Sequence, residues 1–394
     1  MSSIVPETSL DSPPLSAQAA QFVFSSESVS EGHPDKVCDF IADSLLDAYL
    51  SEDSHARVAC EVLCKSNTVV LGGEISSRAK VDHEAVVREA IREIGYTDKG
   101  SDFNDENVRV LQLISTQSPD IALGVDTATN AQKEQGAGDQ GIMFGFACKE
   151  TPELMPLPIS LAHRLTKGLA EDRKTETFSW IRPDAKSQVS VLYEGPIPVA
   201  ITDVLVSTQH APDVSQEEIA RYVRKVLAPR VLGKWFNREI RFHVNPTGSF
   251  VLGGPAADCG VTGRKIIADT YGGAAHHGGG AFSGKDPSKV DRSAAYFCRY
   301  VARQIIDSGL AVKAEIQVAY AIGVAQPVSV KVETFGTGDF QAATEFVRTF
   351  DFRPAAIIER LNLLQPIYRQ TTNYGHFGKK DLPWENGEPR QGLD

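Results

Sequence analysis

The sequence has no apolar run of about 18 residues, the length at which a membrane-spanning helix becomes a candidate. It has no excess of positive charge either, because 51 acidic and 40 basic residues give a net charge of -11. Such a chain is not expected to bind nucleic acid or a membrane surface, and a bound anion would need a local basic cluster. We therefore predict neither of these two partners.

The six cysteines form no CxxC pair, and the sequence contains no HExxH, no GxSxG and no zinc-type cysteine and histidine spacing. Most of the cysteines stand in apolar runs, which indicates buried, reduced thiols. No segment has the pattern of a signal peptide, so we expect a cytoplasmic location. Residues 1–20 are rich in serine, proline and alanine without hydrophobic periodicity, and we expect a disordered tail there.

The same order of expected elements occurs three times: strand, helix, two strands, helix, strand. The first copy has strands near 22–24, 57–64, 68–75 and 108–113, and helices over 34–50 and 83–94. In the second copy, strands over 141–144, 188–193, 199–207 and 241–244 accompany helices over 159–171 and 216–227. The third copy has strands over 265–267, 315–322 and 328–333, and helices over 290–307 and 341–349. This order predicts an α+β fold of three related β-α-β-β-α-β units, although three unrelated segments would also fit.

The densest sign of a ligand site lies between residues 258 and 292, which hold eight of the chain's 32 glycines. The same stretch contains five cations: Arg264, Lys265, Lys285, Lys289 and Arg292. Glycines let backbone N–H groups approach phosphate oxygens, and the cations neutralise them. Residues 279–285 also match the phosphate-loop pattern GxxxxGK, but Asp286 stands where serine or threonine is expected. Anion binding is predicted, with a flexible surface loop as the alternative.

The residues 31–36, Glu-Gly-His-Pro-Asp-Lys, open an expected helix. Pro34 suits the first helical position, and the free N–H groups favour a phosphate. His33 and Lys36 would add donors. Asp35 beside a polyphosphate indicates bridging Mg²⁺, with Asp291 as a second carboxylate. A plain capped helix would explain the same residues.

Several isolated polar or aromatic residues could complete a nucleotide site. Asp184 and Lys186 could bond ribose hydroxyls and a phosphate, or lie in an exposed turn. Glu61 and Glu74 stand in apolar strands, where a carboxylate needs a partner or a cation unless it faces solvent. Phe250 could stack on a base or pack in the core. Together these features indicate a nucleoside-triphosphate enzyme that uses Mg²⁺.

From about residue 22 to residue 384 the chain resembles the methionine adenosyltransferase (S-adenosylmethionine synthetase) family. The matching segments are 28–36, 71–74, 117–121, 136–141, 182–188, 207–210, 258–265 and 269–292. The resemblance implies conversion of ATP, L-methionine and water to S-adenosylmethionine, phosphate and pyrophosphate. The methionine sulfur would attack ribose C5′ in line, and the triphosphate would then be hydrolysed. The family also implies a homodimer with interfacial active sites, and in many members a homotetramer.

The resemblance further implies roles for individual residues. The catalytic residues would be His33, Lys186, Arg264 and Lys285. The ATP and phosphate contacts would be His33, Lys36, Asp139, Asp184, Lys186, Phe250, Asp258, Arg264, Lys265, Ala281, Lys285 and Lys289. The methionine contacts would be Glu74, Gln117, Asp258 and Lys289. Two Mg²⁺ per site would be held by Asp35 and Asp291, and K⁺ by Glu61. Ser249 stands where the family usually has arginine, so any nucleotide contact of that arginine would be missing here.

The family's architecture implies three domains related by pseudo-threefold symmetry and interleaved in sequence. The expected bounds are 21–31 and 149–254 for the N-terminal domain, 32–120 and 255–293 for the central domain, and 121–148 and 294–394 for the C-terminal domain. Residues 117–129 are expected to form a mobile gate. Two alternatives compete with this function: a phosphate-loop kinase or NTPase that releases ADP, and a non-enzymatic nucleotide-binding scaffold.

Overall fold

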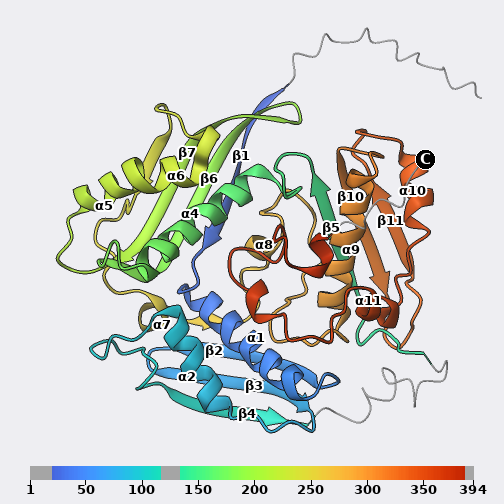
Figure 1. Ribbon diagram of the computed structural model, residues 1–394, viewed down its shortest axis with the longest axis horizontal. Helices are drawn as coiled ribbons and strands as arrows, with labels where there is room; N and C mark the ends of the chain where they lie inside the picture. The colour runs from blue at the N-terminus through green and yellow to red at the C-terminus, as the bar shows by residue number, and fades with distance from the viewer. Residues whose placement is uncertain (1–19, 117–133, 387–394) are drawn as a thin grey trace, which may run out of the picture.

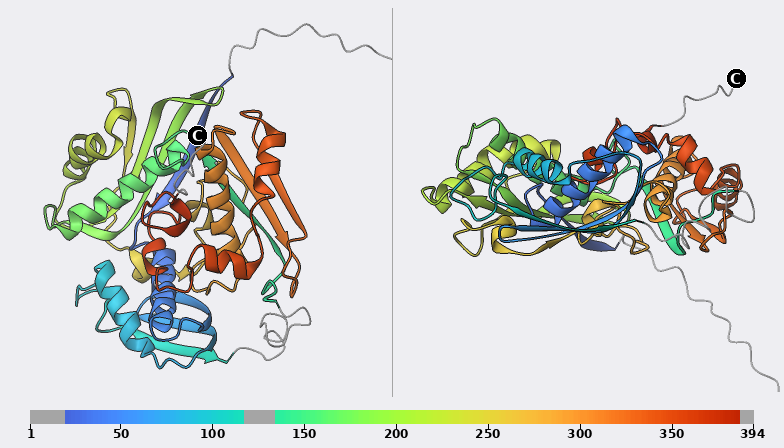
Figure 2. Two further views of the ribbon diagram at one scale, coloured as in Figure 1. Left: turned by 45° about the vertical axis from the view of Figure 1, so that its right-hand side comes forward. Right: turned by 90° about the horizontal axis from the view of Figure 1, so that it is seen from below.

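Three separate β-sheets form the framework of the computed structural model, which describes residues 20–116 and 134–386 (Figure 1). The fold is mixed α+β. Seen from below, the helices gather toward one broad side of a flattened molecule and the strands toward the other (Figure 2). We call the side that carries α1, α2, α4 and α9 the helix face. The opposite side, formed by the uncovered surfaces of the three sheets, is the sheet face.

The first sheet has the strand order β4-β3-β2-β9. Its strands are β2 (Arg57–Lys65), β3 (Thr68–Ser76), β4 (Arg109–Ser115) and β9 (Gly260–Val261). The β2–β3 hairpin is antiparallel, β4 runs parallel to β3, and β9 runs antiparallel to β2. The helices α1 (Pro34–Glu52) and α2 (His83–Ile94) cover one side of this sheet (Figure 1).

The second sheet, β1-β6-β7-β8, repeats the strand order and directions of the first. Its strands are β1 (Gln21–Val29), β6 (Ile181–Glu194), β7 (Ile197–His210) and β8 (Arg241–Val244). The covering helices are α4 (Leu157–Lys174), α5 (Gln216–Tyr222) and α6 (Ala228–Leu232).

The third sheet, β11-β10-β5, is antiparallel throughout. Its strands are β5 (Gly141–Cys148), β10 (Lys313–Tyr320) and β11 (Ser329–Glu333). The helices that accompany it are α9 (Val290–Asp307), α10 (Phe340–Val347) and α11 (Pro354–Arg360).

In each sheet the outer strand comes from a distant part of the chain. β1 precedes α1 in sequence but pairs with β6, β5 precedes α4 but pairs with β10, and β9 precedes α9 but pairs with β2. This exchange brings the end of β1 beside β6, where Val29 lies opposite Lys186. The segments that precede α1 and α9 therefore meet near the centre of the molecule.

The sequence predicted most of these elements to within a few residues, but not all of them. β6 begins at Ile181, well before the expected strand over 188–193, and the helices α7 (Gly254–Ala257) and α11 lie where no helix was expected. The segment 265–267 is not a strand, because Ile266–Asp269 forms the short helix α8, and the strand that pairs with β2 is β9. The expected helix over 216–227 is confirmed, because α5, a π-helical turn over Val223–Leu227 and α6 follow one another without a break as far as Leu232. The expected tail and the gate at 117–129 lie outside the described residues, apart from Ala20. In the two described stretches, no helix is both long and apolar enough to cross a membrane.

Candidate functional site

The start of α1 is the point where three distant segments meet. His33 caps the helix, and its Nδ1 accepts the Asp35 N–H at 3.2 Å. Gly32 lies so close to Pro183 that a Cβ would come within 2.4 Å of its backbone. Gly260 approaches the carbonyl of Pro34 in the same way, at 2.1 Å. Both positions need glycine, because a side chain would push apart the segments that carry the predicted site residues.

Asp35 is the anchor of this junction. Its Oδ1 accepts the Val261 N–H at 3.0 Å, and its Oδ2 accepts a bond from Lys265 Nζ at 2.5 Å. Arg264 adds a guanidinium nitrogen 3.9 Å away. Burial alone would raise the pKa of Asp35, but the bonds from Lys265 and Val261 keep it below its usual value. The carboxylate is therefore ionised and lies beside two cations.

His33 is buried and neutral. Burial, and next the positive charge of Lys265, lower the pKa of His33 to about 3, while Asp35 opposes this to a smaller extent. Since Nδ1 accepts the Asp35 N–H, the ring proton lies on Nε2. A neutral imidazole in this tautomer can donate one hydrogen bond to a ligand oxygen.

Asp184 lies in the same junction on β6. One oxygen accepts the Gly254 N–H at 2.9 Å, whereas the other, Oδ1, is buried and has no hydrogen-bond partner. Burial raises the pKa of Asp184 to about 6, against smaller opposing effects of Gly254 and Lys186. An unpartnered buried carboxylate oxygen is suited to a ligand with hydroxyl donors.

Three further predicted residues, Lys186, Phe250 and Asp258, lie around this junction. Lys186 and Asp258 are exposed, and both influence the charge of His33. Phe250 is half-buried, and His210 fixes its backbone through two bonds of 3.0 Å. The structure thus brings Asp184, Lys186 and Asp258 to the start of α1, as the sequence predicts.

One edge of β2 joins the two cationic loops. Thr262 bonds to Val62, and two residues further along the strand the Cys60 N–H donates to the Gly284 carbonyl at 2.9 Å. Ala59 then bridges to Lys285. The loops at 260–265 and 282–286 therefore follow one another along the same strand edge.

Glu61 lies on β2 between these two contacts, with an exposed side chain on the sheet face. The surrounding protein excludes water from the Glu61 carboxyl and so raises its pKa, while Thr262 and Lys285 oppose this rise. A carboxylate that has lost part of its hydration gains from a nearby cation.

Lys285 and Asp291 form the second charged pair of the site, with Nζ and Oδ2 2.6 Å apart. Both side chains are partly exposed. Lys289 instead bonds to Asp286, which is fully buried and also accepts the N–H groups of Val58 and Ser288. Asp286 is thus a structural acceptor that fixes the loop.

Two predicted cations are buried and already paired. Lys36 donates to Asp39 at 3.0 Å and to Asp269 at 2.6 Å, so a direct phosphate contact would require it to leave two carboxylates. Arg292, counted above among the phosphate-binding cations, is fully buried and makes two 2.7 Å bonds to Asp43. The prediction for Arg292 is wrong, because nothing in the sequence shows that Asp43 lies against it.

The remaining predicted residues surround this centre less closely. Glu74 on β3 and Asp139 are exposed, and Ala281 is half-buried against Gly263. Gln117 lies outside the described residues. Within the described part of the chain, no three acidic, histidine or cysteine side chains are grouped to hold a metal by themselves.

The GxxxxGK match at 279–285 is not a phosphate loop. No strand leads into it, since residues 270–281 are irregular, and α9 begins only at Val290. The phosphate-loop pattern requires a strand before the loop and a helix directly after it. The kinase alternative therefore has no structural support.

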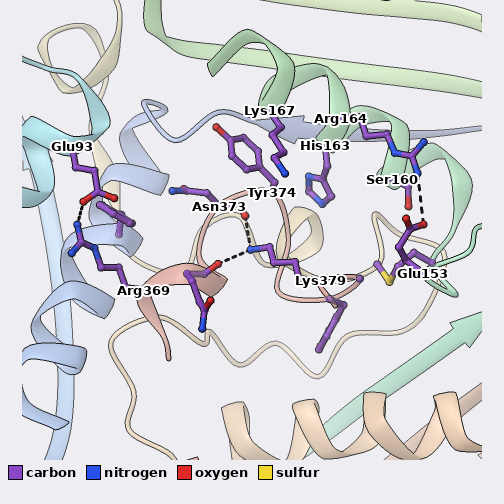
Figure 3. Close-up of a pocket in the computed structure, with 15 residues that line it drawn as sticks. Glu93, Glu153, Ser160, His163, Arg164, Lys167, Arg369, Asn373, Tyr374 and Lys379 are labelled. Atoms are coloured by element: carbon purple, nitrogen blue, oxygen red, sulfur yellow. Dashed lines mark hydrogen bonds and ion pairs between the residues drawn. The ribbon is translucent and has the colours of Figure 1, made fainter. Parts of the chain in front are cut away.

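A cavity of about 440 Å³ opens elsewhere, between α1, α4 and residues 369–379 (Figure 3). Lys379 points into the loop beneath it and donates to three backbone carbonyls at 2.7–3.0 Å. Lys167 and Arg164 extend from α4 along its rim (Figure 3). None of the predicted site residues lines it.

Family models for the N-terminal, central and C-terminal domains of S-adenosylmethionine synthetase match residues 21–119, 134–250 and 252–386. The chain belongs to this family. It is 54% identical over 369 residues to the S-adenosylmethionine synthase of Sorangium cellulosum (strain So ce56), over 93% of this chain and 87% of that protein. It is an enzyme that makes S-adenosylmethionine from ATP and methionine.

Two buried carboxylates beneath the synthetase site escaped the sequence analysis. Asp39 and Asp43 follow Asp35 at four-residue intervals on α1, and both are fully buried. The signal was present, because this spacing puts all three on one helix face, among its apolar residues.

Proposed function

We propose that the residues gathered at the start of α1 and along the edge of β2 form the synthetase's reaction centre. His33, Arg264, Lys265 and Lys285 would bind the triphosphate, with Lys186 and Lys289 as further contacts. Asp184 would bind the ribose and Phe250 the base. Asp258, Glu74 and Gln117 would bind methionine. The observation that carries this proposal is the meeting of His33, Asp35 and Lys265 at one junction with Asp184.

The methionine sulfur needs no base, because a neutral thioether is already nucleophilic. The chain's task is to hold the sulfur in line with the C5′–oxygen bond and to stabilise charge on the departing oxygen. The Nε2–H of neutral His33 is suited to donate to that oxygen. Lys265 and Lys285 would hold the phosphates of the leaving group and keep them in place for hydrolysis.

The carboxylates fit the cations that the family uses. Asp35 is ionised and, like Asp291, pairs with a lysine. Mg²⁺ usually takes one or two carboxylates plus phosphate oxygens, so Asp35 and Asp291 would each hold one ion together with the substrate. Bound Mg²⁺ would neutralise phosphate charge. Glu61 would contribute to a K⁺ site, which its raised pKa supports.

A second copy of the chain would complete the site from the sheet face. Large apolar side chains are exposed there, including Leu113 at 70%, Leu111 at 42% and Ile142 at 44%. Exposed apolar side chains on the strands of two sheets are what a partner would cover, since large apolar patches mark interaction sites. The homodimer would cover these side chains and enclose the exposed Glu74 and Asp258. A homotetramer rests on the family resemblance alone.

The three sheets support the interleaved division into 21–31 with 149–254, 32–120 with 255–293, and 121–148 with 294–394. The first two sheets share strand order and directions, and the third matches their first three strands. A pseudo-threefold relation between the three domains would follow. A cytoplasmic location is supported by six cysteines that are all free.

The proposal is tested by separating transfer from hydrolysis. His33→Asn keeps a good helix cap but has no donor at the position of the imidazole Nε2–H, so adenosyl transfer should slow by about 10²–10³. Hydrolysis of added triphosphate should fall less, because it breaks no bond to C5′. Lys285→Ala should depress both. Single-turnover transfer and steady-state hydrolysis are the measurements, and equal losses for His33→Asn would contradict its role at the leaving oxygen.

A further inference from the structure

Helix α1 carries an aspartate at every fourth residue over most of its length: Asp35, Asp39, Asp43 and Asp47. Residues at this spacing share one helix face, where like charges repel and destabilise an isolated helix. The first three are buried, with at most 2% of each residue exposed. Such a stripe persists only if each carboxylate has strong partners. We call these four residues the aspartate ladder.

Each member of the aspartate ladder accepts backbone N–H groups from a segment that is distant from α1 in the sequence. Asp39 Oδ1 accepts from Gly263 at 2.9 Å, and Asp43 Oδ1 accepts from Gly284 at 2.9 Å. Asp35 accepts from Val261, as described above. The first three members thus bind the two cationic loops, one with Arg264 and Lys265 and the other with Lys285.

Buried cations hold the middle of the ladder in place. Lys36 bridges Asp39 to Asp269, which belongs to α8 directly after the first loop. Arg292 at the start of α9 donates to Asp43 from its two terminal guanidinium nitrogens. The loops are therefore attached to the same rigid helix that presents His33, through bonds that no substrate contact requires.

We propose that Asp39 and Asp43 are positioning residues, which set the distance between His33 and the two cationic loops without touching substrate. Lys36 acts with them through Asp39. The inference rests on the proposed function for the identity of the loops' ligand, but the bonds of the ladder can be measured without it.

The ladder supplies its own control. Asp47 accepts the N–H groups of Tyr368 at 3.0 Å and Arg369 at 2.8 Å. It therefore holds a chain segment to α1 by the same kind of bond, but that segment borders the cavity of Figure 3 and carries no proposed site residue. Asp39→Ala and Asp47→Ala each remove one carboxylate from the same helix and place alanine, a good helix former, there.

Hydrogen exchange by mass spectrometry and steady-state kinetics on the full-length enzyme test the proposal. Asp39→Ala should speed exchange in residues 258–266 and lower kcat by about 10², since small misplacements cost that much, while KM for methionine stays within about threefold. Asp47→Ala should speed exchange in residues 366–371 and leave kcat within about twofold. Equal losses of kcat per folded molecule in both variants would overturn the proposal, as would unchanged kcat in Asp39→Ala.

A measurement on the unaltered protein applies even if Asp39→Ala fails to fold. The amides of Val261, Gly263 and Gly284 should be protected from exchange in the absence of substrate, in contrast to other irregular segments. Exchange of these amides at the rate of an unstructured loop would overturn the ladder. That result would leave the assignments of His33 and Lys285 intact, whereas full activity of Lys285→Ala would contradict those assignments and not the ladder.

Discussion

The two broad faces of this synthetase carry opposite features. On the helix face lies a cavity of about 440 Å³ whose charged groups are mostly matched, such as Arg369 with Glu93 and Lys379 with three carbonyls. The sheet face has exposed leucines and valines, together with exposed side chains at the proposed site. The charged groups of the cavity are therefore matched within the chain, whereas the proposed site would be completed by a second copy. This contrast supports our proposal that the reaction takes place on the sheet face and not in the cavity.

The largest effect is expected from a charge on the sheet face. Leu113 on β4 is 70% exposed, and its neighbours Val110 and Ile114 pack into the core instead. Leu113→Glu should leave the folded chain intact but place a carboxylate in the proposed dimer interface, where an unpaired charge costs several kcal/mol. Sedimentation should show monomers, and activity should fall more than about a hundredfold.

The control for this change lies on the helix side. Val226, in the π-helical turn, is 41% exposed, and Val226→Glu should change neither the oligomeric state nor the activity. A Leu113→Glu protein that remains dimeric and active would remove the sheet face from the proposed interface.

The extent to which the sequence predicts this arrangement depends on whether a signal is local. Helix α1 was predicted because Val37, Ile41 and Leu45 repeat at helical spacing, and all three are fully buried. The segment 265–267 was assigned wrongly, because its two isoleucines, Ile266 and Ile267, fit a strand as well as a helix. The true partner of β2 is a strand of only two residues, Gly260–Val261, which has no period to detect.

Long-range pairs were the other source of error. Arg292 looked like a phosphate ligand beside Lys285 and Lys289, but it is matched by Asp43, which is 249 positions away in the sequence. Lys36 is paired similarly with Asp269. Charge and glycine content locate the site region, whereas only the fold separates a cation that faces ligand from one that holds the loops.

A moderate effect is expected at Asp184, where function and stability should move in opposite directions. Because burial raises the pKa of Asp184 to about 6, the folded state binds its proton more tightly than the unfolded chain, whose aspartate has a pKa of 3.8. The cost of the ionised form is absent below pH 3.8 and complete above about pH 6. Asp184→Asn removes this cost.

The Asp184→Asn enzyme should therefore be more stable at pH 7, by up to about 3 kcal/mol at 1.36 kcal/mol per pKa unit. It should also bind ATP about tenfold more weakly, since the ribose loses a charged acceptor. Urea unfolding at pH 5 and 7, together with ATP titration, measures both effects. Equal ATP affinity would contradict the ribose contact, and a loss of stability would show that Oδ1 has a partner in solution.

The smallest effect is expected on the helix face, and a pair of lysines makes the comparison direct. Lys167 is 60% exposed at the rim of the cavity in Figure 3, and its contact with Glu171 is 3.9 Å long. A surface pair of this kind contributes at most about 1 kcal/mol. Lys186 is also exposed, but it lies on β6 beside His33 and Asp184.

Lys167→Ala should leave kcat/KM for ATP within about twofold, whereas Lys186→Ala should lower it at least about tenfold through loss of a phosphate contact. Both substitutions remove the same side chain from an exposed position, so their stability should be similar and any difference in kinetics reports the face on which ATP binds. Equal losses in the two variants would mean that net charge, and not the sheet face, governs ATP binding.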